Sequence, residues 1–172
     1  MALSITTREQ FEVYKFSPAV TIGVPLLAIF VQAYLPLKLS FFNIFDLPLL
    51  VTIFFAVARR NPITGLLTGM IIGLVQDSLT HSFLGLYGIS KTVVGFAASS
   101  LGVKIDVENP GSRLLMATGF YLVQKVVYYL VARGMAGMEA PLELPHAFGA
   151  AVANGFLAIV LFSMLDKMKQ RS

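Results

Sequence analysis

The stretch GLLTGMIIGLVQDSLTHSFLGLYGISK, residues 65–91, decides the fold of this chain. Its first half places Gly65, Gly69 and Gly73 at four-residue spacing, so the three glycines share one face of a helix. In lipid, where packing leucine on leucine gains little, a row of small residues lets another helix backbone come close. The row therefore predicts a helix-packing or partner interface, and packing within the same chain is the favoured interpretation.

A polar corner follows the glycine helix. Gln76 and Asp77 end an otherwise uncharged segment, and a short loop over residues 78–84 separates them from a second apolar segment that carries Lys91. The pattern predicts two closely packed apolar helices joined at a polar, charged corner.

The composition places the chain among membrane proteins. Of its 172 residues, 56% are hydrophobic and 13% are charged, and the mean hydropathy is +0.78. Soluble domains have about 25% charged residues. We therefore predict an all-α polytopic membrane protein with no separate soluble domain. The absence of cysteine excludes disulfides and thiolate chemistry, and the net charge of +4 requires only basic cytoplasmic loops and no nucleic-acid partner.

Six transmembrane helices are predicted, and with their flanks they form one integral membrane domain over residues 1–172. Asp46 is expected to cap the short second helix, with Pro48 in its first turn. The predicted helices cover about residues 17–37, 44–58, 63–76, 85–103, 113–131 and 146–165. The bundle spans residues 17–166; before it lies a cytoplasmic segment, 1–16, read as an interfacial helix or a frayed tail, and after it a basic cytoplasmic tail, 167–172.

The basic residues predict the orientation, because Lys and Arg concentrate in cytoplasmic loops. With six helices, one side holds Lys38 and Arg133 only. The other side holds Arg8, Lys15, Arg59, Arg60, Lys104, Arg113, Lys167, Lys169 and Arg171. We therefore predict that both termini are cytoplasmic.

Polar residues inside the predicted helices are expensive in lipid and normally face protein or water. Counting 1.5 Å per residue places Lys91, Lys125 and Asn154 in the outer half of the membrane, and Asp77 lies at the outer end of the third predicted helix. Together with Gln76 and Gln124, these four residues can form one polar cluster. An inward-facing Asp77 is expected to pair with Lys91. In the alternative interpretation both lysines extend to the outer interface, and Asp77 is solvated or caps the next turn.

Catalytic and metal-binding patterns are weak. Asp77, Ser78 and His81 have the residue types of a triad, but they are neighbours in one loop and lack a separate oxyanion hole. Ser90 and Lys91 are adjacent, so on a helix they point about 100° apart. His81 and His146 do not have metalloprotease spacing. We therefore predict no enzyme activity, no cofactor and no metal site.

The order of these motifs resembles the rod shape-determining protein MreD family of bacterial inner membranes. The resemblance rests on a short helix led by Pro48, a basic turn at Arg59–Arg60, the glycine row with Asp77, and Leu84–Gly85. A second piece is Asn154–Gly155 in the last predicted helix, followed by the basic tail.

The resemblance implies a non-enzymatic, multi-pass scaffold of the cell-elongation complex in the cytoplasmic membrane. Family members associate with MreC, and with it link the cytoskeletal MreB to the peptidoglycan synthases RodA and a class B penicillin-binding transpeptidase. The family is also similar in fold to the substrate-binding subunits of energy-coupling-factor vitamin transporters, which supply the alternative function. Those subunits dock through an AxxxA stripe on the first helix; here Ala28 is followed by Gln32, which argues against transport.

Overall fold

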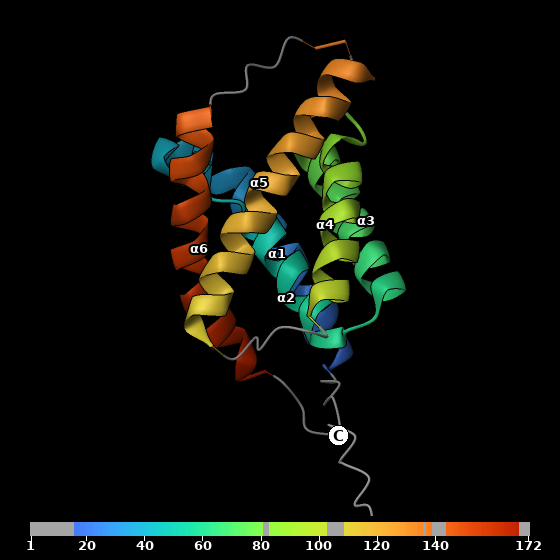
Figure 1. The fold of residues 1–172 in the computed structure, drawn as a ribbon, viewed down its shortest axis with the longest axis vertical. Helices are drawn as coiled ribbons and strands as arrows, with labels where there is room; N and C mark the ends of the chain where they lie inside the picture. Colours follow the sequence, from blue (N-terminus) through green and yellow to red (C-terminus); the bar gives the residue numbers. More distant parts are fainter. Residues whose placement is uncertain (1–15, 81–82, 103–108, 136, 139–143, 169–172) are drawn as a thin grey trace, which may run out of the picture.

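The computed structural model describes residues 16–80, 83–102, 109–135, 137–138 and 144–168. In these segments the chain forms a helical bundle, with both α1 beginning and α6 ending at the lower end in Figure 1. The elements are α1 (Pro18–Lys38), the 3-10 helix η1 (Ser40–Ile44), α2 (Leu47–Arg59), α3 (Pro62–Leu79), α4 (Leu86–Leu101), α5 (Pro110–Gly134) and α6 (Leu144–Asp166). The predicted interfacial helix in residues 1–15 lies outside the described residues.

Proline and a capping side chain together start four of the helices. At α2, the Asp46 carboxylate accepts a hydrogen bond from the Leu49 N–H, and Pro48 occupies the first turn, as predicted. Asn109 caps α5 in the same way, ahead of Pro110. The predicted helix was expected to start at about residue 113, but α5 begins earlier because proline is favoured in the first turn of a helix.

Helix α2 is the centre of the bundle. It packs against α1, α3, α4, α5 and α6, and every residue between its first and last is buried. Its 13 residues give a length of about 20 Å, well short of the roughly 30 Å hydrocarbon core of a bilayer. Because its residues are buried, the helix is surrounded by the rest of the protein.

Helices α3 and α4 form the closest pair in the bundle. A Cβ atom added at Gly65 would overlap the Gly95 carbonyl oxygen, and one added at Gly69 would overlap the Lys91 carbonyl oxygen. Gly73 meets the Tyr87 backbone in the same way. The glycine row thus faces α4 within the same chain. The two helices are so close there that a side chain at any of the three glycine positions would overlap the α4 backbone.

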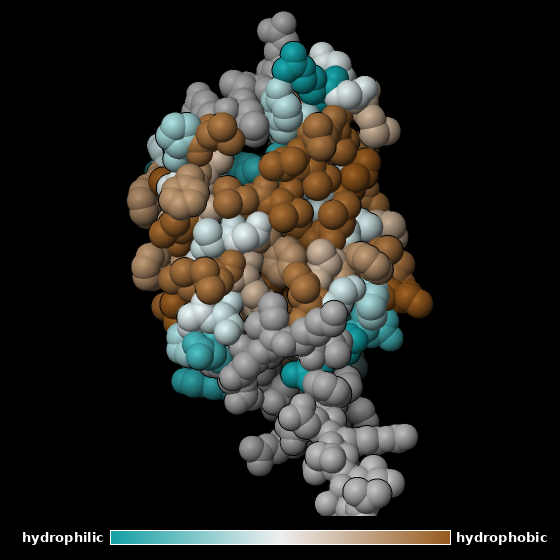
Figure 2. Space-filling view, viewed as in Figure 1, coloured by the Kyte–Doolittle hydropathy of each residue, from teal (hydrophilic) through white to brown (hydrophobic). Residues whose placement is uncertain are grey.

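The outer surface of the bundle is largely apolar. Figure 2 shows hydrophobic side chains over the middle of the molecule, with hydrophilic residues toward its two ends. Among the described residues, α1, α3, α5 and α6 are long and apolar enough to cross a membrane, while α2 is shorter. The described residues thus form six α-helices, as predicted, and four of these helices meet the length and hydropathy expected of a membrane span.

Candidate functional site

Asp46 lies where η1 meets α2 and is held from several directions. Only 7% of the residue is exposed. Its backbone N–H donates to Asn154 Oδ1 on α6 at 2.9 Å, and Asn154 Nδ2 donates to the Ile44 carbonyl at 2.8 Å. On the other side, the Leu47 N–H donates to Gln32 Oε1 on α1 at 3.1 Å. Helices α1 and α6 therefore fix the backbone on which the Asp46 carboxylate is presented.

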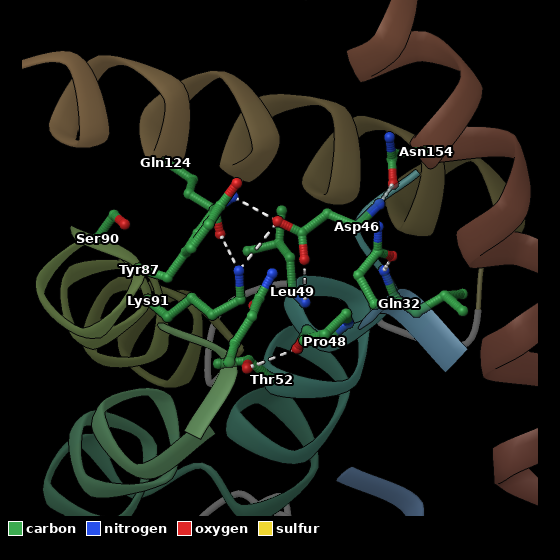
Figure 3. A network of polar contacts seen from close by, with 12 residues as sticks. Gln32, Asp46, Pro48, Leu49, Thr52, Tyr87, Ser90, Lys91, Gln124 and Asn154 are labelled. Atoms are coloured by element: carbon green, nitrogen blue, oxygen red, sulfur yellow. Dashed lines mark hydrogen bonds and ion pairs between the residues drawn. The ribbon is translucent and has the colours of Figure 1, made fainter. Parts of the chain in front are cut away.

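The Asp46 carboxylate pairs with Lys91, which is completely buried on α4. Lys91 Nζ lies 2.9 Å from Asp46 Oδ2 and 2.9 Å from Gln124 Oε1 on α5. Gln124 Nε2 in turn donates to Asp46 Oδ2 at 2.6 Å, which closes a triangle of three side chains (Figure 3). Lys91 Nζ also lies 4.6 Å from the centre of the Tyr87 ring. We call Asp46, Lys91, Gln124 and Asn154 the Asp46 network.

The Asp46 network satisfies its own polar groups. The carboxylate oxygens of Asp46 accept from Leu49, Lys91 and Gln124, and the Gln124 side-chain amide both accepts through its oxygen and donates through its nitrogen. A buried ion pair is tolerated only when its remaining hydrogen-bonding capacity is satisfied in this way. Because its members come from α2, α4, α5 and α6, the network ties the central helix to three of its neighbours.

Asp77 occupies a different corner and does not meet Lys91. Its Oδ2 accepts from the N–H groups of Gly85 and Gly88 at 2.9 and 3.0 Å, and its Oδ1 accepts from the Tyr87 N–H at 3.1 Å. These N–H groups lie at the start of α4, where backbone donors have no acceptor within the helix itself. The expected Asp77–Lys91 pair was therefore wrong: Asp77 caps α4, which was the alternative interpretation, and the partner of Lys91 is Asp46.

A cavity of about 440 Å³ lies beside the Asp46 network. Gln76 and Lys125 line it, so these two predicted cluster residues are near the network without joining it. Lys125 is half-buried and its Nζ lies 5.3 Å from the centre of the Tyr121 ring. The complete lining consists of Gln32, Ala33, Tyr34, Pro36, Leu37, Asn43, Phe45, Asp46, Gln76, Leu79, Thr80, Tyr87, Tyr121 and Lys125.

Comparison with protein families gives one result that covers nearly the whole chain. The model of the family described as rod shape-determining protein MreD matches residues 14–171. The chain belongs to the MreD family. Neither the curated proteins nor the solved structures compared with it give a match.

Part of the segment on which the MreD resemblance rested, the glycine row with Asp77 and Gly85, forms the α3–α4 pair. The glycine row faces α4, and Asp77 and Gly85 meet at the turn between the two helices, where the Gly85 N–H donates to the Asp77 carboxylate. Gly85 has a φ of 105°, a left-handed conformation that favours glycine. Asn154 and Gly155, the second piece of the resemblance, lie in the buried part of α6, where Gly155 packs against α5 at Thr118.

The main residue that sequence reasoning missed in this MreD-family chain is Asp46 as a charge partner. It was predicted only as the cap of the short second helix, which it also is. Asp77 was favoured as the partner of Lys91 because it is nearer in sequence, and that criterion was misleading. The aromatic cavity lining, including Tyr34 and Tyr121, gave no recognisable sequence signal because aromatic residues are common throughout membrane helices.

In the part of the chain that the structure describes, no three His, Cys, Asp or Glu side chains gather as metal ligands. Ser90, which had been considered beside Lys91, donates its hydroxyl to the Leu86 carbonyl in its own helix. A second ion pair, Arg113 with Asp166, joins the start of α5 to the end of α6 at the opposite end of the bundle.

Proposed function

We propose that this chain is a non-enzymatic membrane scaffold of the bacterial cell-elongation complex. In this proposal it binds MreC and helps couple MreB to the peptidoglycan synthases RodA and a class B penicillin-binding transpeptidase. The observation that carries the proposal is the family match over residues 14–171, since the MreD family determines rod shape.

The architecture supports a scaffold. The charged and amide groups of the Asp46 network bind one another. This arrangement suits a network that holds the helices rigidly and does not take part in a reaction. Helix α1 buries little of its surface against the bundle and exposes large apolar side chains to its surroundings, among them Ile22, Leu27 and Phe30. A rigid bundle with broad apolar faces can hold other membrane proteins in a fixed arrangement.

We propose that the protein spans the bacterial cytoplasmic membrane with both termini inside. The basic residues of the chain supply the argument. Single cysteines are introduced into the cysteine-free chain as Arg60→Cys, Lys104→Cys, Gln170→Cys and Gly137→Cys. An impermeant thiol reagent added to whole cells should label only the Gly137→Cys variant. Labelling of the Lys104→Cys variant would contradict this topology.

Co-purification from native membranes tests the scaffold role. The tagged chain should bring down MreC together with wall-synthesis proteins. Recovery of an ATPase module without any wall-synthesis protein would overturn the proposal. As a control, the Gly119→Ala variant should recover the same partners as the parent chain. Gly119 is exposed on α5, with open space around its Cα.

The second candidate is a small-molecule-binding subunit of a vitamin transporter, and the cavity of about 440 Å³ is the observation that favours it. Against it, Gln32 interrupts the small-residue stripe such subunits use for docking. Gln32 instead holds the Leu47 N–H at the start of α2, so its side chain has a function inside the bundle.

A further inference from the structure

The cavity beside the Asp46 network is assembled from parts of the chain that are distant in sequence. Its walls come from α1, from the η1–α2 connection around Asp46, from the end of α3, the start of α4 and the middle of α5. Its volume of about 440 Å³ falls in the range of small-molecule sites, which is about 300–1,000 Å³. The walls combine apolar and aromatic side chains with a few polar groups, which is the usual composition of such sites.

Gln76 supplies the first specific indication of a ligand. The residue is 3% exposed and lines the cavity, and its Oε1 atom has no hydrogen-bond donor among the described residues. Buried carbonyl oxygens in native proteins are nearly always hydrogen-bonded, because an unsatisfied one loses its interaction with water. A molecule in the cavity that carries an O–H or N–H group would satisfy this atom.

Lys125 supplies the second specific indication of a ligand. The ion pairs formed within the described residues are Lys91–Asp46 and Arg113–Asp166, so the ammonium group of Lys125 pairs with no described carboxylate. Asp46 also borders the cavity, but Lys91 already neutralises its charge. The cavity therefore presents one uncompensated positive charge, which suits a ligand with one negative charge.

The wall formed by α1 indicates how such a ligand could enter. Tyr34 and Leu37 line the cavity and are also 55% and 80% exposed at the outer surface of the bundle. A headgroup in the cavity could therefore continue into apolar chains lying along α1. The three tyrosines of the lining, Tyr34, Tyr87 and Tyr121, add hydroxyl groups and ring faces around it.

We propose that this cavity binds a phosphodiester monoanion that carries neighbouring hydroxyl groups. Lys125 contacts the phosphate and Gln76 Oε1 accepts a hydrogen bond from a hydroxyl. The same chemistry occurs in a phosphoglycerol lipid headgroup and in a water-soluble glycerophosphodiester. The site goes beyond the scaffold role and does not depend on it, because it rests on the cavity and not on any partner protein.

Thermal unfolding of the purified full chain in detergent tests the proposal with three probes. These are phosphatidylglycerol, phosphatidylcholine and glycerophosphoglycerol. Phosphatidylglycerol should raise the melting temperature in a saturable manner, whereas phosphatidylcholine, which lacks the hydroxyls and the net charge, should not. A comparable shift with glycerophosphoglycerol assigns the site to a soluble ligand, and a shift with the lipid alone assigns it to a headgroup.

Two variants connect the effect to the cavity. Lys125→Gln and Gln76→Met should each weaken phosphatidylglycerol binding by about tenfold, the effect of losing one charge-assisted or buried hydrogen bond. Without lipid, Gln76→Met should melt at or above the temperature of the parent, because it removes an unsatisfied buried oxygen. The control is Lys167→Gln, which removes an exposed lysine just beyond α6 at the opposite end and should bind normally.

Equal shifts with phosphatidylglycerol and phosphatidylcholine would overturn the proposal. Unchanged binding in either cavity variant would do the same, as would the absence of a shift with all three probes. Because each variant is also compared with the parent in the absence of lipid, a loss of folding cannot be mistaken for a loss of binding.

Discussion

Helix α4 has two contrasting faces. The face toward α3 meets a row of glycines, and Gly69 lies directly against the Lys91 backbone carbonyl. The face toward α2 and α5 presents the Lys91 side chain, whose charge is buried against Asp46 and Gln124. One face is thus stabilised by the close fit of two backbones and the other by matched polar groups, and both involve the same residue of α4.

The difference shows how a membrane bundle can specify a unique arrangement. Apolar side chains alone distinguish poorly between alternative packings in lipid, since lipid tails are equally apolar. The glycine face permits close approach only where the glycines are, and the Lys91 face excludes any packing that leaves the charge without Asp46. Together they fix both the rotation and the position of α4.

The Lys91 face is expected to be the more sensitive of the two. Lys91→Met leaves the Asp46 carboxylate buried without its cation, and breaking a buried pair from one side costs about 3–5 kcal/mol. The loss should appear as a lower melting temperature of the detergent-solubilised protein. A change no larger than that of Lys167→Gln, an exposed lysine, would mean that the ion pair contributes nothing.

The glycine face should respond to the addition of a single methyl group. Gly69→Ala introduces a Cβ that overlaps the Lys91 carbonyl, so α3 and α4 must separate, at a cost of about 3 kcal/mol. Gly119→Ala makes the same chemical change on α5, where the added atom meets open space, and should be neutral or stabilising by about 0.5–1 kcal/mol. Membrane accumulation and melting temperature measure both. Equal behaviour of the two variants would show that the α3–α4 contact is not tight.

The corner between the two helices should give the smallest effect. Asp77→Ala removes the acceptor of three backbone N–H groups at the start of α4, and the loss of a helix cap costs about 1–2 kcal/mol. Asp77→Asn keeps one side-chain oxygen as an acceptor and should lose less. If the asparagine variant were as unstable as the alanine variant, the negative charge of Asp77, and not its capping, would be the important property.

The sequence predicted the local features and missed a long-range one. The glycine row, the cap of α2 by Asp46 and the presence of six helices could be predicted because each depends on spacing or on residues a few positions apart. The Asp46–Lys91 pair joins residues 45 positions apart, on helices whose relative placement no local pattern determines. The cavity could not be predicted from the sequence either, because its lining comes from five elements that meet only in the folded chain.

Helix ends were predicted less accurately for a related reason. Helices α5 and α6 extend beyond their predicted apolar segments, to Pro110–Gly134 and Leu144–Asp166. Hydropathy marks where a helix enters lipid, whereas the helix itself continues until its backbone groups find caps. The cap of α5, Asn109, lies four residues before the predicted start of this helix at about residue 113.

The most direct test of this account is a pair of double-mutant cycles that share Lys91→Met. One cycle combines it with Asp46→Asn and the other with Asp77→Asn, and unfolding of each set is measured in the same detergent. The double change at Asp46 and Lys91 should recover at least about 1 kcal/mol relative to the sum of the single losses, while the Asp77 cycle should be additive. Coupling between Asp77 and Lys91, with additive losses for Asp46 and Lys91, would contradict the assignment of the buried ion pair.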